Sequence, residues 1–149
     1  MNTITAVSVN ERSEPSTIFG AVVPLVGRAL LSAIFLLSVI GKLQAPAATI
    51  GYIASVGMPA PPVAYALAVL IELVGGLALL VGFRTRIAAG ALALYSLAAA
   101  VGFHSNFADL NQFIHFLKNV AIAGGMLQVV AFGAGAWSLD AYRLGKGRR

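Results

Sequence analysis

Four long apolar runs constrain this chain more than any other feature of its sequence. They cover Gly20–Gly41, Val63–Phe83, Ile87–Phe103 and the apolar body of the last run, Leu117–Phe132. Each is close to the roughly 20 residues with which a helix crosses a bilayer. Only 10% of the 149 residues are charged, against about 25% in soluble domains. The sequence therefore predicts an all-α integral membrane protein, a single bundle of four spanning helices.

A short interfacial helix is expected in the connection between the first two spans. Their connection, Lys42–Pro62, is long for a helix bundle. Pro46 suits the first turn of a helix, and Gly57, followed closely by prolines, suits its end. By contrast, FRTR at Phe83–Arg86 is a tight turn, so the second and third spans are expected to form an antiparallel hairpin.

Basic residues indicate how the chain is oriented and divided. Residues 1–17 are expected to be a disordered tail, because they lack the apolar core of a signal peptide. Residues 18–137 form the membrane domain, and residues 138–149 form a basic tail. One side of the membrane would hold Arg12, Arg84, Arg86, Arg143, Lys146, Arg148 and Arg149, and the other Lys42 and Lys118. Basic loops favour the cytoplasm, so both termini are expected there.

Several function classes are excluded by what the sequence lacks. The chain contains no cysteine, which excludes disulfides, a thiolate nucleophile and iron–sulfur clusters held by this chain. The basic RLGKGRR has neither interleaved aromatics nor base-reading side chains, so nucleic acid is not an expected partner. No recognised metal-ligand spacing is present, and no metal site is predicted.

Two charges stand deep within the apolar runs. Glu72 interrupts LIELVGGLALLVGF, and Arg28 lies in the first span. At 1.5 Å per residue from the cytoplasmic end of its span, Glu72 is about 16 Å deep and Arg28 is about 12 Å deep. A guanidinium matches a carboxylate, so the sequence predicts a buried Arg28–Glu72 pair. Two roles stay open for it: registering helices, or lining a polar cavity as a catalytic proton relay.

A polar stripe is expected where the fourth helix begins. Asp109 can cap a helix starting near Leu110, and the next polar residues share one helical face. Together with residues at the ends of other spans, they would wall a pocket with Glu72 as its floor and Tyr52 and Met58 in its lid. The predicted ligand-binding residues are Lys42, His104, His115, Lys118 and Asn119. The simpler alternative is that these lysines extend to lipid headgroups and that the histidines are solvated.

Three segments together resemble the DoxX family of small bacterial membrane proteins. They are GRALLSAIFLLSVIGKL at Gly27–Leu43, ELVGGLALLVGFRTRIAAG at Glu72–Gly90 and HFLKNVAIAGGMLQV at His115–Val129. The order GR, GK, E-x-x-GG with a basic turn, and KN before another GG carries the resemblance. Carried over residue by residue, the family's polar signature falls on Arg28, Lys42, Glu72, Lys118 and Asn119.

The resemblance implies a four-helix bundle in a bacterial inner membrane. Members of the family are similar to the membrane subunit of thiosulfate:quinone oxidoreductase, which implies a quinone-interacting subunit with a redox-enzyme partner. In that role His115, Lys118 and Asn119 would donate hydrogen bonds to a bound quinone, and Phe113 and Phe116 would wall its ring. This chain has no recognisable ligands for flavin, haem or a cluster. The alternative is a non-catalytic membrane scaffold or small-solute carrier that uses the same pocket.

Overall fold

The computed structural model describes residues 18–146, and all regular structure within this range is helical. The helices are α1 (Ile18–Gln44), α2 (Pro46–Ser55), α3 (Pro61–Val81), α4 (Thr85–Phe103), α5 (Leu110–Phe132) and α6 (Leu139–Lys146). Four of them, α1, α3, α4 and α5, are long and apolar enough to cross a membrane. The four-span bundle and the short helix α2 are therefore confirmed. The tail expected over residues 1–17 and the last three residues of the basic tail lie outside the described range.

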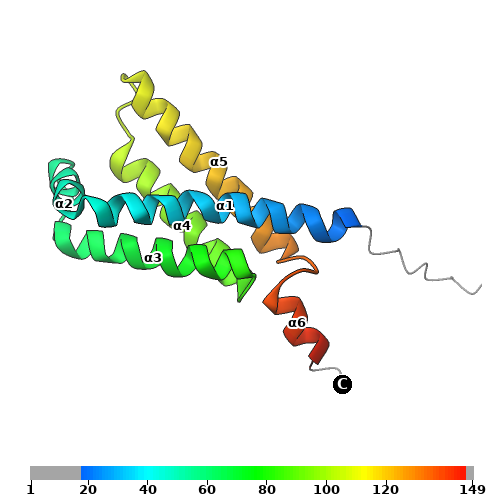
Figure 1. Ribbon diagram of the computed structural model, residues 1–149. Coiled ribbons are helices and arrows are strands. Elements are labelled where there is room, and N and C mark those ends of the chain that lie inside the picture. The colour runs from blue at the N-terminus through cyan, green and yellow to red at the C-terminus, as the bar shows by residue number, and fades with distance from the viewer. Residues whose placement is uncertain (1–17, 147–149) are drawn as a thin grey trace, which may run out of the picture.

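The spanning helices form two antiparallel pairs held together by small residues. α1 packs along α3, α4 packs along α5, and α3 joins the pairs by packing on α4 (Figure 1). A Cβ on Gly75 would lie 2.9 Å from the Leu92 side chain of α4, and one on Gly76 would lie 3.0 Å from Leu36 of α1. A side chain at either position would therefore push on a leucine of the next helix, and glycine lets the membrane helices approach closely.

The two pairs diverge toward the end of the bundle where α2 lies. Near mid-helix, Leu31 of α1 lies against Gly125 of α5. Beyond that contact, the first half of α5 leans away from α1 (Figure 1). α2 crosses this end of the bundle and buries Ile53. We call this the α2 end, and the opposite end, where α6 lies, the α6 end.

The hydrophobic core lies where the two pairs meet. Its large members are Phe35, Leu79, Leu92 and Met126, each at most 4% exposed. Many other large apolar side chains of the spanning helices face outward. This distribution is expected of helices whose surroundings are hydrocarbon instead of water.

At the α6 end, a side chain of α6 caps the N-terminus of α4. The Asp140 carboxylate accepts hydrogen bonds from the Arg84 and Thr85 backbone N–H groups, both at 2.8 Å, and from the Thr85 hydroxyl at 2.7 Å. These groups begin α4, whose first N–H groups have no partner within the helix. Arg143 of α6 also lies over the Phe83 ring, 4.5 Å from its centroid. This helix lies within residues 138–149, which the sequence predicts only as a basic tail.

Arg28 holds the segment that leads into α6. Its Nη2 donates to the Trp137 carbonyl at 2.6 Å, and its side chain is 1% exposed. It passes Gly82, where a Cβ would overlap both Arg28 Nη1 and Ser138 Cβ. Gly82 also ends α3 with φ 71°, in the left-handed region that favours glycine. Gly82 therefore both allows the turn after α3 and leaves room for the buried Arg28 guanidinium.

Replacing Asp140 should weaken the fold in a pH-dependent way. Asp140→Ala is expected to lower the free energy of unfolding by about 1 kcal/mol, the usual cost of losing a helix cap. Thermal unfolding in mild detergent at pH 7 measures this, and Arg143→Gln on the same helix is the control that keeps the cap.

The pH dependence of this effect has a defined sign. Burial acts to raise the pKa of Asp140, but hydrogen bonds from Thr85 and Arg84 and the charge of Arg143 hold it below its ordinary value of 3.8. A lowered folded pKa gives stability that is present above the unfolded value and is lost as pH falls through the folded one. The advantage of wild type over Asp140→Asn should therefore shrink below about pH 4. An advantage that stays constant down to about pH 2 would contradict this role.

The topology expected from the basic residues can be tested directly. The start of α1, the α3–α4 turn and α6 all lie at the α6 end (Figure 1). Reporter fusions after Arg86 and after Arg149 should therefore both report the cytoplasm, and a fusion after Gly57 the opposite side. A fusion at Arg86 or Arg149 that reports the outside would exclude this orientation.

Candidate functional site

Glu72 is the centre of a buried polar cluster near the α2 end. Its side chain is almost fully buried, and Lys42 Nζ lies 2.8 Å from Oε2 and 2.9 Å from Oε1. The Tyr95 hydroxyl donates to Oε1 at 2.7 Å, and the Ser38 hydroxyl does so at 3.3 Å. Lys42 Nζ also donates to Ser38 Oγ at 2.5 Å. We call Ser38, Lys42, Glu72 and Tyr95 the carboxylate cluster.

The predicted pair of Arg28 with Glu72 is wrong. Glu72 pairs with Lys42, and Arg28 donates to a backbone carbonyl at the α6 end. The reason is side-chain direction, because helical side chains lean toward the N-terminus of their own helix. On α1 this turns Arg28 away from Glu72 and brings Lys42 down toward it. Glu72 lies on the antiparallel α3, so it leans the opposite way and meets Lys42.

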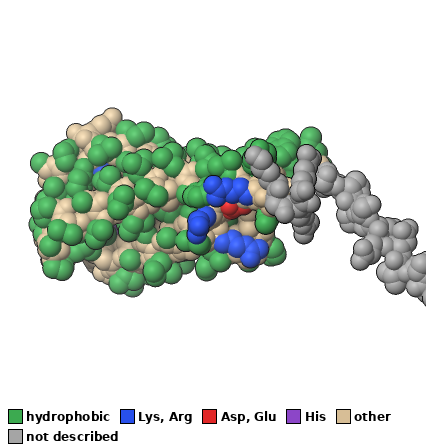
Figure 2. All heavy atoms as spheres, turned by 90° about the horizontal axis from the view of Figure 1, so that it is seen from below, with side chains coloured by type: hydrophobic (Ala, Val, Ile, Leu, Met, Phe, Trp, Pro, Cys, Tyr) green, Lys and Arg blue, Asp and Glu red, His purple; other side chains and the backbone are tan. Residues whose placement is uncertain are grey.

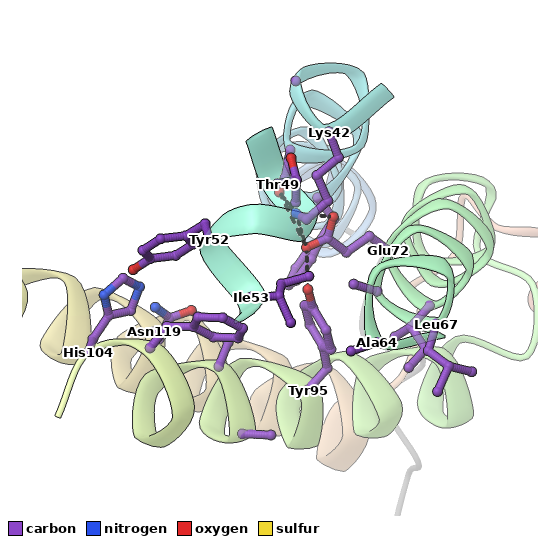
Figure 3. A pocket seen from close by; sticks show the side chains of 18 of the residues that line it. Lys42, Thr49, Tyr52, Ile53, Ala64, Leu67, Glu72, Tyr95, His104 and Asn119 are labelled. Carbon is purple, nitrogen blue, oxygen red and sulfur yellow. Dashed lines mark hydrogen bonds and ion pairs between the residues drawn. The ribbon is translucent and has the colours of Figure 1, made fainter. Parts of the chain in front are cut away.

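A cavity of about 650 Å³ opens beside the carboxylate cluster. Figure 3 shows Lys42, Glu72 and Tyr95 converging at one side of it. Its walls are mostly apolar and come from α1 to α5. The apolar and aromatic lining residues include Phe35, Ile53, Ala64, Leu67, Ala68, Ile71, Ala98, Ala99, Phe103 and Ile122.

A second polar group lies at the other side of the cavity. Tyr52, His104 and Asn119 gather there, away from Lys42 and Glu72 (Figure 3). His104 Nδ1 lies 2.8 Å from Gln112 Oε1. Since an amide oxygen can only accept, Nδ1 donates, which leaves Nε2 of the neutral ring as an acceptor. The cavity therefore has a polar group at each side and hydrophobic walls between them.

The cavity is partly covered at the α2 end. The Tyr52 ring stacks on Phe103, with centroids 5.6 Å apart. Met58, in the turn after α2, reaches Gly102 of α4, where a Cβ would lie 3.3 Å from the Met58 methyl. Both Tyr52 and Met58 line the cavity, in the positions expected of a lid.

The structure brings together only part of the predicted ligand-binding set. Lys42, His104 and Asn119 line the cavity. His115 does not line it but stacks on His104, with ring centroids 5.1 Å apart. Lys118 is exposed and outside the cavity lining. Its position suits the alternative of a lysine extended to lipid headgroups.

The aromatic wall also differs from the expectation. Phe113 and Phe116 pack edge-on against Phe107, outside the cavity. The rings that do line it include Phe35 and Tyr95, which pack with centroids 6.5 Å apart.

Tyr95 and Ser38 are the site residues that the sequence analysis missed. Tyr95 is the only aromatic residue between Ile87 and Gly102 in an alanine-rich span, and Ser38 precedes Lys42 by one helical turn. That spacing places Ser38 and Lys42 on one face, and it was the available signal. No group of three metal-binding side chains occurs among residues 18–146.

The comparisons with known proteins agree with this architecture. A family model described as DoxX matches residues 23–105. The inner membrane protein YqjF of Escherichia coli (strain K12) is 40% identical over 116 residues, which cover 78% of this chain and 88% of that protein. The inner membrane protein YphA of the same organism is 35% identical over 131 residues, covering 82% of this chain and 93% of YphA. No solved structure matches the chain.

A double-mutant cycle should identify the partner of Glu72. Removing one member of a buried ion pair typically costs about 3 to 5 kcal/mol, because the other charge is left unpaired. Glu72→Gln and Lys42→Met are each expected to destabilise the protein, and the double variant should recover part of the loss, with a coupling of about 1 to 3 kcal/mol. The measurement is thermal or denaturant unfolding in mild detergent.

The matched control for this cycle is Arg28→Met combined with Glu72→Gln. These two changes should add without coupling, because the residues interact with different partners. Strong coupling of Glu72 to Arg28, or none to Lys42, would contradict the observed pairing.

Proposed function

This chain belongs to the DoxX family, and we propose that it is a multi-pass inner-membrane protein whose cavity binds a quinone. In this proposal the chain presents the quinone to a redox-enzyme partner. The observation that carries the proposal is the cavity itself, an apolar space with hydrogen-bonding groups at both sides.

The dimensions of the cavity suit a ring-shaped ligand. Its volume of about 650 Å³ falls within the roughly 300 to 1,000 Å³ of small-molecule sites. Aromatic side chains such as Phe35 and Phe103 supply flat apolar surface for the ring. A wholly polar solute would lose its hydration without regaining enough hydrogen bonds from these walls.

The polar groups match the two oxygens of a quinone. On one side Lys42 and Tyr95 carry N–H and O–H groups that can turn from Glu72 to a ligand oxygen. On the other side Asn119 has an amide N–H, and His104 Nε2 can accept from a hydroquinone hydroxyl. In this proposal each ring oxygen would lie toward one of the two polar groups.

The carboxylate cluster supplies proton chemistry that suits this ligand. Reduction of a quinone to a hydroquinone takes up two electrons and two protons. The Tyr95 hydroxyl and the Lys42 ammonium hold protons next to Glu72 that they could pass to a ligand oxygen, and both groups would then regain protons from water. Because the chain has no cysteine for a cluster and no recognisable flavin or haem ligands, the electrons would come from the partner.

The open side of the cavity suits a ligand dissolved in the bilayer. Ile34 and Gly41 of α1 line the cavity and are exposed. Both residues belong to α1, and α5 leans away from α1 beyond the contact of Leu31 with Gly125 (Figure 1). A quinone with an isoprenoid tail could enter sideways here, with its tail remaining among the lipids.

Binding of a soluble ubiquinone analogue to the purified protein tests the proposal. Tyr95→Phe removes one hydroxyl next to Glu72 and should weaken binding by about 1 kcal/mol, or roughly fivefold. Ala99→Phe, which fills the apolar wall, should abolish binding. Fluorescence quenching or calorimetry in mild detergent measures both.

Lys118→Ala is the matched control, because Lys118 is exposed outside the cavity. It should bind like wild type, whereas Lys42→Ala should not. If wild type binds no quinone, or if Ala99→Phe binds as well as wild type, the quinone proposal is wrong. The scaffold or small-solute carrier then becomes the better account of the same cavity.

A further inference from the structure

A second cavity lies at the α6 end, far from the carboxylate cluster. It encloses about 470 Å³ between the start of α4, the end of α5 and α6. From its charge and its rim we propose that it binds the headgroup of an anionic phospholipid. This site is independent of the quinone proposal. Its lining residues include Arg84, Arg86, Ile87, Phe132, Asp140 and Leu144.

The cavity carries an excess of positive charge. Arg84 and Arg86 line it with exposed side chains. The single carboxylate in the lining, Asp140, is engaged with the first N–H groups and the hydroxyl of α4. Figure 2 shows basic side chains gathered around an acidic one on a face that is otherwise mostly hydrophobic. An excess of positive charge therefore remains for an anion.

The Arg86 side chain is available to bind an anion. Among the described residues its guanidinium has no hydrogen-bond or ion-pair partner. It lies beside Gly133, where a Cβ would be 3.5 Å from Nε. Gly133 has φ 83°, so a side chain there is disfavoured and the space beside the guanidinium stays open. A free guanidinium offers a fork of donors that matches two phosphate oxygens.

The apolar rim of the cavity favours a lipid over a soluble anion. Ile87, Phe132 and Leu144 line the same cavity and are 66%, 80% and 73% exposed. Such large apolar side chains would be unfavourable around a site for a hydrated ion. They suit the first carbons of acyl chains that leave a headgroup bound between the arginines.

The location of the cavity agrees with this chemistry. Two of its elements are the ends of spanning helices, so it lies at the membrane boundary. α6 also presents exposed Leu139 and Leu144, preceded by the exposed Trp137. A short helix with an apolar face and a tryptophan is typical of the bilayer interface. Basic pockets between membrane helices at this level are suited to acidic lipid headgroups.

Native mass spectrometry of the full-length protein in mild detergent tests the proposal. The probes are dioleoyl phosphatidylglycerol and, as the zwitterionic control, dioleoyl phosphatidylcholine. Wild type should retain phosphatidylglycerol preferentially. Arg86→Gln should weaken its binding about fivefold, and Arg84→Gln with Arg86→Gln about 30-fold, at roughly 1 kcal/mol for each charge.

Arg143→Gln is the matched control, since it removes one exposed arginine of the same end that does not line the cavity. It should bind phosphatidylglycerol like wild type. Equal retention of the two lipids by wild type, a comparison that needs no variant, would overturn the proposal. So would an Arg143→Gln effect as large as that of Arg86→Gln. Displacement of the lipid by millimolar glycerol phosphate would assign the site to a soluble phosphate and overturn its assignment to a lipid.

Discussion

The ion pair between Lys42 and Glu72 is the interaction on which the cavity depends. A carboxylate among apolar helices is costly to bury unless it is paired and hydrogen-bonded. Glu72 meets both conditions, because Lys42 and Ser38 come from α1 and Tyr95 comes from α4. A single carboxylate on α3 thus fixes the register of three helices. The antiparallel arrangement of α1 and α3 is what lets the lysine and the glutamate lean toward each other.

The shape of the cavity follows from the helix that this cluster leaves out. α5 contributes no side chain to the carboxylate cluster and packs chiefly along α4. Its contact with α1 includes the close approach of Leu31 to Gly125, and beyond that point α5 leans away. The space between the helix pairs is then bounded by polar groups on both sides and partly covered by Tyr52 on Phe103. The carboxylate cluster joins α1, α3 and α4 but not α5. The space between the helix pairs therefore stays open as an apolar cavity with polar groups at both sides.

The sequence was sufficient for features that follow from length and composition. The four spans and α2 could be predicted because hydrophobic length, Pro46 and Gly57 act locally. The Asp109 cap is likewise local, and its carboxylate accepts from the Asn111 N–H at 2.8 Å. The partner of Glu72 could not be obtained from depth alone, since depth locates the Cα and a lysine or arginine side chain reaches several ångströms from it. The direction in which each side chain leans decided the pairing.

The same limit explains why Lys118 was predicted to bind the ligand but lies outside the cavity, and why α6 was not predicted. Lys118 shares a helical face with Asn119 by spacing, but only Asn119 is turned toward the cavity. The packing of α5 on α4 decides which of these two side chains reaches the cavity. The sequence of α5 alone does not determine that packing. α6 is short and basic, with weak helical signals of its own, and is held by contacts with residues more than 50 positions away.

Those distant contacts make α6 part of the fold. Arg28 is buried, and within residues 18–146 its one hydrogen bond is donated to the Trp137 carbonyl just before α6. The Asp140 carboxylate acts on the same guanidinium electrostatically while it caps α4. Without this segment, a buried cation and the start of a spanning helix would both lose their partners, each at a cost in free energy. Arg28 is therefore a structural residue of the α6 end, and it takes no part in the carboxylate cluster.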